Sequence, residues 1–182
     1  MRKVTYGGAI SLDGYLAGPD EALDWLRWSD DAAKLSAKSF RDVDTMLMGR
    51  KTFEDGQRLG GGPKMKGVRT YVFSRSWNER ELDSRLLPGQ SPPELVRDDA
   101  ADFVRRLKGE EGGDIIVMGG GEIGSALIEA GLVEEIGFSV HPVLLGGGTP
   151  AFRPMQGRVE LTLMETRAIE GDCVMMRYLV LN

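Results

Sequence analysis

The sequence is poor in the residues from which disulfides, metal sites and hydrolase triads are built. It holds one cysteine, Cys173, and one histidine, His141, among 182 residues. A single cysteine excludes an internal disulfide and makes a cytoplasmic location the default expectation. A lone histidine excludes a multi-histidine metal centre, so we assign no metal ligands. A Gly-x-Ser-x-Gly elbow is also missing, which argues against a Ser-His-Asp hydrolase.

Long apolar runs and blocks of like charge are absent too. No stretch approaches the ~20 apolar residues of a membrane helix, and the segment after Met1 is too short and glycine-rich for a signal-peptide core. We therefore expect no membrane partner. A net charge of −5 without a basic run argues against nucleic acid as a partner. A protein of this charge must bind an anionic ligand with local amides and arginines.

Apolar segments and turn signals alternate in a way that predicts a single domain over residues 1–182. Hydrophobic residues make up 41% and charged residues 28%, as in ordinary globular proteins. The patterns predict strands over 4–12, 45–48, 70–73, 115–118 and 135–140, and helices from Ser29, from Asp98 or Asp99, and over 122–130. Loops are expected at 60–63 and 87–93.

The last two predicted strands, 159–167 and 173–180, are joined by Glu170-Gly171-Asp172, which indicates an antiparallel hairpin. The whole pattern predicts an α/β fold of three α/β/α layers, whose mainly parallel sheet is finished by this C-terminal hairpin. In such a sheet the ligand is expected at the carboxyl ends of the strands.

A glycine-rich turn follows the clearest predicted strand, 115–118. The segment Gly119-Gly120-Gly121-Glu122-Ile123-Gly124 matches Gly-x-Gly-x-x-Gly. Glycines let the backbone approach a phosphate, and the helix N-terminus offers unpaired N–H groups and a positive dipole end. A tight turn of any α/β protein is the alternative. A Rossmann fold fits poorly, because the motif comes late and the next strand ends at Ser139-Val140-His141-Pro142 without an acidic ribose ligand.

Two further strand ends carry groups that suit anions. Gly49-Arg50-Lys51-Thr52 follows the strand at 45–48, where Arg50 can fork onto a phosphate and Thr52 can donate a hydrogen bond. Ser74-Arg75-Ser76 follows the strand at 70–73. For each segment alone, a helix cap or a solvated arginine is the alternative. Because one crevice can collect three such strand ends, together they favour a nucleotide site.

Five motifs spread over nearly the whole chain stand in a fixed order. They are 9–17 (AISLDGYLA), 48–54 (MGRKTFE), 72–75 (VFSR), 116–122 (IVMGGGE), and 131–135 (GLVEE) followed by 142–148 (PVLLGGG). In this order they resemble the dihydrofolate reductase-like superfamily, which includes the RibD C-terminal (reductase) domain of riboflavin biosynthesis. The chain is most similar to the small stand-alone branch, since Tyr15 replaces that domain's usual lysine and no deaminase domain precedes it.

The resemblance implies a reductase that uses NADPH, and it implies a place for each matching residue. Nicotinamide would be lined by Ala9, Leu16 and Ala17. The phosphates would meet Gly49, Arg50 and Thr52, with Arg50 and either Ser74 or Arg75 near the 2′-phosphate. The pyrophosphate and nicotinamide side would be contacted by Met118, Gly119, Gly120, Gly121, Glu122 and Ile123. Members of the family are commonly dimers, so a homodimer is expected, with 142–148 and 178–181 as candidate contacts and core packing as the alternative for the latter.

The implied reaction is hydride transfer to a small, planar heterocycle of the pterin or pyrimidine kind. Asp13 and Asp24 are the candidate proton donors or substrate anchors, although Asp13-Gly14 is also a plain turn signal. Trp25 and Trp28 are candidates for stacking on a flat substrate, with core or interface packing as the alternative. The loops 13–29 and 55–67, which would define the acceptor, match no specific pattern. A non-catalytic nucleotide-binding protein of this fold, or a binder of phosphoribosyl ligands, is the alternative function.

Overall fold

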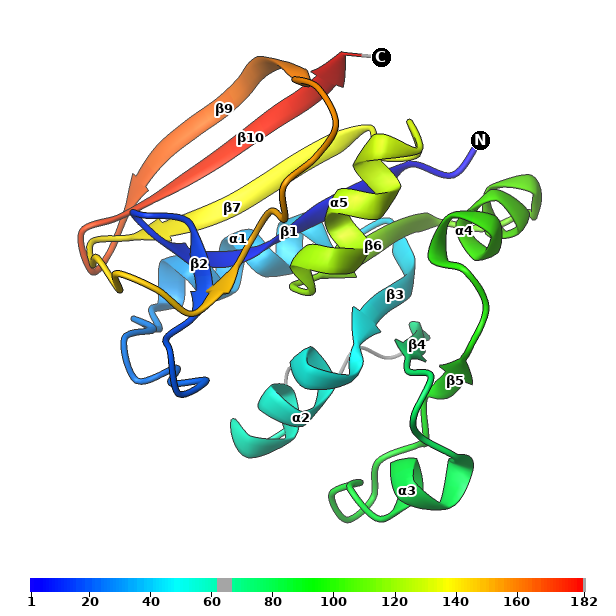
Figure 1. Cartoon of the computed structure of the whole chain (residues 1–182). Helices are drawn as coiled ribbons and strands as arrows, with labels where there is room; N and C mark the ends of the chain where they lie inside the picture. The colour runs from blue at the N-terminus through cyan, green and yellow to red at the C-terminus, as the bar shows by residue number, and fades with distance from the viewer. Residues whose placement is uncertain (62–66, 182) are drawn as a thin grey trace.

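A computed structural model describes residues 1–61 and 67–181 of the chain. Its main sheet has eight strands in the order β5-β4-β3-β6-β1-β7-β10-β9, and β2 and β8 form a small second sheet (Figure 1). The strands are β1 (Val4–Ser11), β2 (Tyr15–Ala17), β3 (Val43–Gly49), β4 (Arg69–Phe73), β5 (Glu94–Val96), β6 (Asp114–Met118), β7 (Glu135–His141), β8 (Thr149–Pro150), β9 (Glu160–Ile169) and β10 (Cys173–Leu181). The helices are α1 (Asp30–Ser39), α2 (Arg50–Arg58), α3 (Glu79–Asp83), α4 (Ala100–Gly109) and α5 (Gly121–Glu129).

The strand directions confirm the predicted sheet. The pairs from β5 to β7 are all parallel, whereas β10 runs antiparallel to both β7 and β9. Strand β6 lies between β3 and β1, and Met118 is in register with Met48 on one side and with Gly7 on the other. Strands β3, β4 and β5 are added toward one edge of the sheet, and the chain then returns to place β6 on the other side of β3. The strand order therefore reverses between β3 and β6, and open α/β sheets bind ligands at such a point.

Helices cover both faces of the sheet, as the three-layer prediction requires. Figure 1 shows α4 and α5 in front of the sheet and α1 behind it. The main core lies under α4 and α5, where Tyr6, Val104, Val117 and Leu127 are fully buried. A smaller cluster around Phe53, on α2, packs against Val72 of β4 on the opposite face. None of the helices in the described part of the chain is long and apolar enough to cross a bilayer.

Local signals placed several boundaries correctly. Ser29 caps α1 by accepting the Ala32 N–H at 3.1 Å, and Asp99 caps α4 by accepting from Ala101 and Asp102. Gly131 follows α5 with a φ of +66°, the left-handed conformation that ends many helices.

Four short elements and one helix length differ from the sequence prediction. The strands β2, β5 and β8 and the helix α3 were not predicted, since each has only two to five residues and too little periodicity. Helix α2 continues to Arg58, so the expected loop 55–67 starts later than predicted. Residues 62 and 63 of the predicted loop 60–63 lie outside the described residues.

Candidate functional site

The glycine-rich turn begins α5 with two left-handed residues. Gly119 and Gly120 have φ values of +53° and +67°, a region that residues with a Cβ rarely adopt. Gly120 is the N-cap of α5, and within the described residues no side chain caps this end. The first N–H groups of α5 are therefore left without a side-chain acceptor, next to the positive end of the helix dipole.

The second predicted phosphate segment meets this turn. A Cβ built on Gly119 would lie 3.0 Å from Thr52 Oγ1, and one built on Gly120 would lie 3.6 Å from the Gly49 amide nitrogen. The Ile123 side chain reaches within 3.6 Å of the corresponding position on Gly49. Gly49 is the N-cap of α2, and again no described side chain caps that helix. Two helix N-termini, both capped by glycine, thus converge at the carboxyl ends of β3 and β6.

Three glycines of the turn also fix how it packs. The Gly119 N–H donates to the Gly7 carbonyl of β1 at 3.0 Å. A methyl on Gly121 would lie under 3.0 Å from the Pro150 carbonyl oxygen of β8, and one on Gly124 would meet the Tyr6 ring. Gly121 and Gly124 are therefore needed for close packing, whereas Gly119 and Gly120 shape the surface of the turn. Glu122, in the first turn of α5, is exposed, so its carboxylate lies in solvent.

Two of the three residues predicted to line nicotinamide, Leu16 and Ala17, are linked to the same turn. Ala9 lies on β1, in register with Ser139 of β7. Leu16 and Ala17 lie on β2, which pairs with β8, and the Pro150 carbonyl of β8 packs closely against Gly121. Ala17 is only 3% exposed, so it contributes mainly backbone and packing to this wall. The structure thus places Leu16 and Ala17 of the first motif near the turn of the fourth motif through β8, whereas a role for Ala9 in lining nicotinamide stays a prediction.

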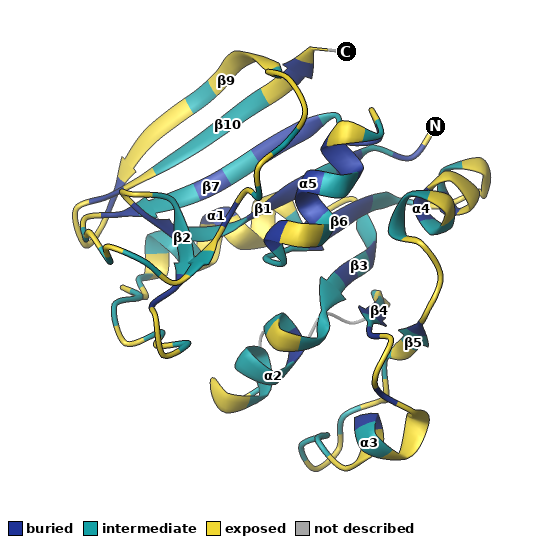
Figure 2. Cartoon of the chain, in the orientation of Figure 1, coloured by how far each residue is buried: buried dark blue, intermediate teal, exposed yellow. Residues whose placement is uncertain are grey.

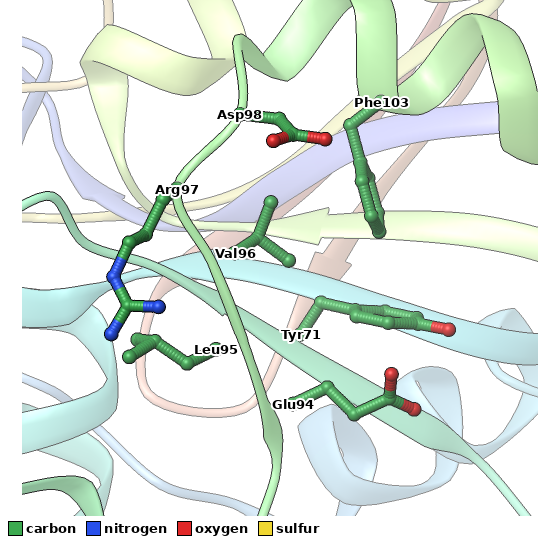
Figure 3. Close-up of a pocket in the computed structure, with 7 residues that line it drawn as sticks. All are labelled: Tyr71, Glu94, Leu95, Val96, Arg97, Asp98 and Phe103. Atoms are coloured by element: carbon green, nitrogen blue, oxygen red, sulfur yellow. The ribbon is translucent and has the colours of Figure 1, made fainter. Parts of the chain in front are cut away.

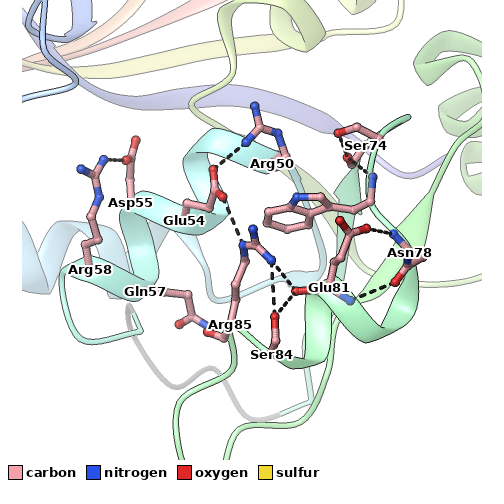
Figure 4. Close-up of polar contacts among 12 residues, drawn as sticks. Arg50, Glu54, Asp55, Gln57, Arg58, Ser74, Asn78, Glu81, Ser84 and Arg85 are labelled. Carbon is pink, nitrogen blue, oxygen red and sulfur yellow. Dashed lines mark hydrogen bonds and ion pairs between the residues drawn. The ribbon is translucent and has the colours of Figure 1, made fainter.

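Arg50, Ser74 and Arg75 lie at the outer end of this site. The Ser74 hydroxyl accepts the Trp77 N–H at 3.1 Å, and the Arg50 guanidinium lies 5.8 Å from the centre of the Trp77 ring. Arg50 also donates to Glu54 at 3.0 Å (Figure 4). Arg75 is exposed. Ser74 and Arg50 therefore both contact Trp77, a residue that the sequence analysis did not select.

Asp13 holds a neighbouring loop in place. Its carboxylate accepts from the Ser11 hydroxyl at 2.6 Å, from the Leu145 N–H at 3.1 Å and from the Gly146 N–H at 2.8 Å. The Ser11 hydrogen bond is the main cause that lowers the pKa of Asp13. An ionised carboxylate with three donors is suited to positioning the 142–148 segment. Proton donation by Asp13 stays a prediction, and its contacts do not favour it.

The second acidic candidate, Asp24, lies on the surface near two tryptophans. Asp24 is exposed, and it has no hydrogen-bond partner among the described residues. Trp25 lies edge-on to His141 with the ring centres 5.2 Å apart, whereas Trp28 is 76% exposed. The roles of Asp24 as a proton donor or substrate anchor stay predictions.

His141 is a buried polar residue that the sequence prediction left without a role. It ends β7 in register with Ser11, and its Nδ1 accepts the Arg27 N–H at 3.2 Å. The ring is 4% exposed, and this burial is the main cause that lowers its pKa below the ordinary value of 6.5. The groups around the ring, the Arg27 N–H, the Trp25 ring and the Cys173 thiol at 3.5 Å from Nδ1, are distant in sequence, so no sequence signal could have found it.

The lowered pKa of His141 predicts a pH dependence of stability. Below pH 6.5 the unfolded chain takes up a proton at this ring that the folded chain resists, so the free energy of unfolding falls as the pH falls below about 6.5. Above that pH the contribution is fully present. Urea unfolding of the wild type and of His141→Asn at pH 5, 6, 7 and 8 tests this. We expect the variant to show a flatter profile between pH 5 and 7, and an unchanged slope would contradict the assignment.

A separate pocket lies at the edge of the sheet, where the Ser74 N–H donates to the carbonyl of Val96, one of its lining residues, at 3.0 Å. It has a volume of about 250 Å³ and is lined by Tyr71, Phe103 and residues 94–98 (Figure 3). The helix beside it, α4, has its first N–H groups bound by the Asp99 carboxylate. This pocket therefore lacks the free helix N-terminus that the glycine-capped α2 and α5 offer, and we place the functional site at the latter.

Comparison with known proteins assigns the chain to a family. The family model described as the RibD C-terminal domain matches residues 2–175, so the chain belongs to the RibD C-terminal domain family. YyaP of Bacillus subtilis (strain 168), an uncharacterized protein, is 30% identical over 192 residues, which cover 98% of this chain and 95% of YyaP.

Solved structures share the fold. A candidate riboflavin biosynthesis protein from Shewanella sp. PV-4 superposes with a TM-score of 0.81 at 20% identity, with both chains fully covered. A diaminohydroxyphosphoribosylaminopyrimidine deaminase/5-amino-6-(5-phosphoribosylamino)uracil reductase from Thermotoga maritima gives a TM-score of 0.68 at 14% identity, over 99% of this chain and 57% of that one. Together with the family match, these structures confirm the predicted dihydrofolate reductase-like fold.

Proposed function

We propose that the protein is an oxidoreductase that uses NADPH to transfer hydride to a small heterocyclic acceptor of the pterin or pyrimidine kind. The observation that carries the proposal is the convergence of two glycine-capped helix N-termini, at Gly49 and Gly120. Their N–H groups and dipole ends favour a pyrophosphate, and the missing side chains let its oxygens approach the backbone. The reductase name of the Thermotoga relative supports a pyrimidine-like acceptor.

The residues around this convergence fit the rest of a dinucleotide. Thr52 offers a hydroxyl beside Gly119, and Arg50 offers a guanidinium near Ser74 for the 2′-phosphate. No carboxylate occupies the position after Phe73 at the end of β4, where an acidic group would repel a 2′-phosphate. The site is therefore suited to NADPH over NADH.

The chain's own residues would align the reactants and exclude water. Bound NADPH supplies the hydride. Ala9 presents a small side chain at the carboxyl end of β1, and β2 and β8 close the adjoining side against α5. Asp13 would hold the 142–148 segment beside the acceptor through the Leu145 and Gly146 amides. Such positioning lowers the entropy cost of bringing the reactants together.

The reaction is tested by following NADPH oxidation at 340 nm with a panel of pterins, pyrimidines and quinone-like acceptors. We expect at least one heterocycle to be reduced in proportion to protein concentration. Tight NADPH binding without turnover of any acceptor would favour the non-catalytic alternative. Displacement of NADPH by simple ribose phosphates at similar concentrations would favour a binder of phosphoribosyl ligands.

We further propose that the protein forms a homodimer through its C-terminal hairpin. Strand β9 is the edge of the main sheet, and Figure 2 shows it exposed along most of its length. Large apolar side chains on this hairpin are between 39% and 52% exposed, namely Leu161, Leu163, Met164, Leu179 and Leu181. An apolar edge strand of this length invites pairing with another chain. We expect light scattering to give a dimer mass that Leu163→Glu lowers, and a wild-type monomer at all concentrations would contradict this.

A further inference from the structure

Glu54 joins two arginines beside the proposed 2′-phosphate site. One of its carboxylate oxygens accepts from Arg50 Nη1 at 3.0 Å, and the other accepts from Arg85 Nε at 3.2 Å (Figure 4). Both guanidiniums lie near Trp77, at 5.8 Å from the ring centre for Arg50 and 4.3 Å for Arg85. Glu54 and Arg85 come from α2 and from the segment after α3, so only the folded chain brings them together.

The group of Arg50, Glu54 and Arg85 has a net positive charge and a hydrogen-bond donor that is not used within the described residues. Two guanidiniums face one carboxylate, so the three groups carry a net positive charge. Arg85 Nη1 donates to the Glu81 carbonyl at 2.7 Å, and Arg85 Nη2 has no partner among the described residues. A cavity of about 440 Å³, lined by Glu54, Arg85, Glu21, Gln57 and Arg58, opens beside them. An incoming anion can therefore reach donors that the folded chain leaves unused.

We propose that Arg85 is the second guanidinium of the 2′-phosphate site, and that Glu54 holds Arg85 and Arg50 at a spacing that suits a dianion. This inference rests on the proposed binding of NADPH. A phosphate dianion between two guanidiniums gains charge-assisted hydrogen bonds from both. Glu54 also repels that dianion, so it moderates the affinity while it orients the arginines. Arg85 thus sets the preference for NADPH over NADH together with Arg50.

The experiment is a binding titration of four ligands, NADPH, NADH, 2′,5′-ADP and 5′-AMP, against the wild type and Arg85→Gln. We expect Arg85→Gln to weaken NADPH and 2′,5′-ADP roughly tenfold and to leave NADH and 5′-AMP within about twofold. Arg105→Gln removes the same charge from the exposed surface of α4 and should leave all four affinities unchanged. Glu54→Gln should strengthen NADPH and 2′,5′-ADP by a few fold, because the amide loses the repulsive charge while its one carbonyl oxygen still accepts from one of the two arginines.

A purely structural role for Arg85 would give a different pattern. Stacking on Trp77 alone predicts that Arg85→Gln lowers the melting temperature and weakens all four ligands equally, and this result would overturn the proposal. Unchanged NADPH preference in Arg85→Gln would overturn it as well. Arg85→Lys keeps the charge without the planar fork and, if Arg85→Gln fails to fold, should still lose part of the 2′-phosphate preference.

The two proposals fail in distinguishable ways. Wild-type protein that binds neither dinucleotide overturns the proposed function. If that protein still binds 2′,5′-ADP over 5′-AMP and Arg85→Gln abolishes the difference, the second guanidinium is supported without the dinucleotide. If the wild type prefers NADPH and Arg85→Gln keeps that preference, only the assignment of Arg85 is wrong.

Discussion

Arg50→Ala is expected to weaken NADPH binding by about 2–3 kcal/mol, or roughly 30- to 150-fold, while NADH binding stays within about twofold. The reason is that Arg50 begins α2 directly after Gly49, and its guanidinium lies near Trp77 and Ser74 at the outer end of the site. A 2′-phosphate there loses a charge-assisted fork, whereas the pyrophosphate keeps the two helix N-termini. Fluorescence titration of both dinucleotides measures the two affinities.

Two controls sharpen the Arg50 result. Arg105→Ala removes a surface arginine that pairs with Asp102 on α4, so it should change neither affinity. The melting temperature of Arg50→Ala should stay near that of the wild type, because Arg50 is partly exposed and its pair with Glu54 spans one helical turn. Equal losses for NADPH and NADH would mean that Arg50 does not recognise the 2′-phosphate.

Gly121→Ala is expected to be the most damaging single-methyl change in the glycine-rich turn. The added methyl would lie under 3.0 Å from the Pro150 carbonyl oxygen and about 3 Å from the Ala151 backbone. Because these are backbone atoms, no side-chain rotation can relieve the clash. Either α5 or β8 must shift, at a cost of about 1–3 kcal/mol in the free energy of unfolding. Because β8 pairs with β2, the same shift should disturb Leu16 and Ala17 and weaken dinucleotide binding.

A glycine elsewhere in the chain provides the matched control for Gly121. Gly56 lies inside α2, and a Cβ built on it meets no atom within 4 Å. Gly56→Ala should therefore raise the stability by up to about 1 kcal/mol, since alanine favours the helix and restricts the unfolded chain. Urea unfolding and NADPH titration of both variants test the pair. A Gly121→Ala protein with wild-type stability and binding would show that the turn and β8 do not pack as described.

Local signals explain why much of the fold was predictable. The strand at β6 has consecutive apolar residues and is followed by glycines, so its end and the start of α5 follow from the sequence alone. Ser29 and Asp99 marked helix starts by ordinary capping chemistry. The parallel register of β3 and β6 then places Gly49 beside Gly120, which joins two motifs that the sequence showed only separately.

The parts that escaped prediction depend on contacts between distant residues. The strands β2 and β8 are too short for a periodic signal and form only because each pairs with the other. The link between Glu54 and Arg85 spans 31 residues and includes α3, a helix with five residues. The buried ring of His141 is oriented by the Arg27 backbone, 114 residues away. Such groups need the folded chain before their roles can be seen.

Asp13 illustrates a residue whose position was predictable and whose role was not. Its place after β1 follows from the Asp-Gly turn signal, yet its carboxylate binds the amides of Leu145 and Gly146, on a loop far along the chain. The acceptor of the proposed reaction was not predictable from the sequence for a related reason. The loops 13–29 and 55–67, which were expected to define it, lie far apart in the chain.

The most direct test of the proposed function is a titration of the purified wild-type protein with NADPH and with NADH under identical conditions. The two glycine-capped helix N-termini predict that both dinucleotides bind, and the guanidinium of Arg50 predicts that NADPH binds at least about tenfold more tightly. Equal affinities, or no binding of either dinucleotide, would contradict the assignment of this site.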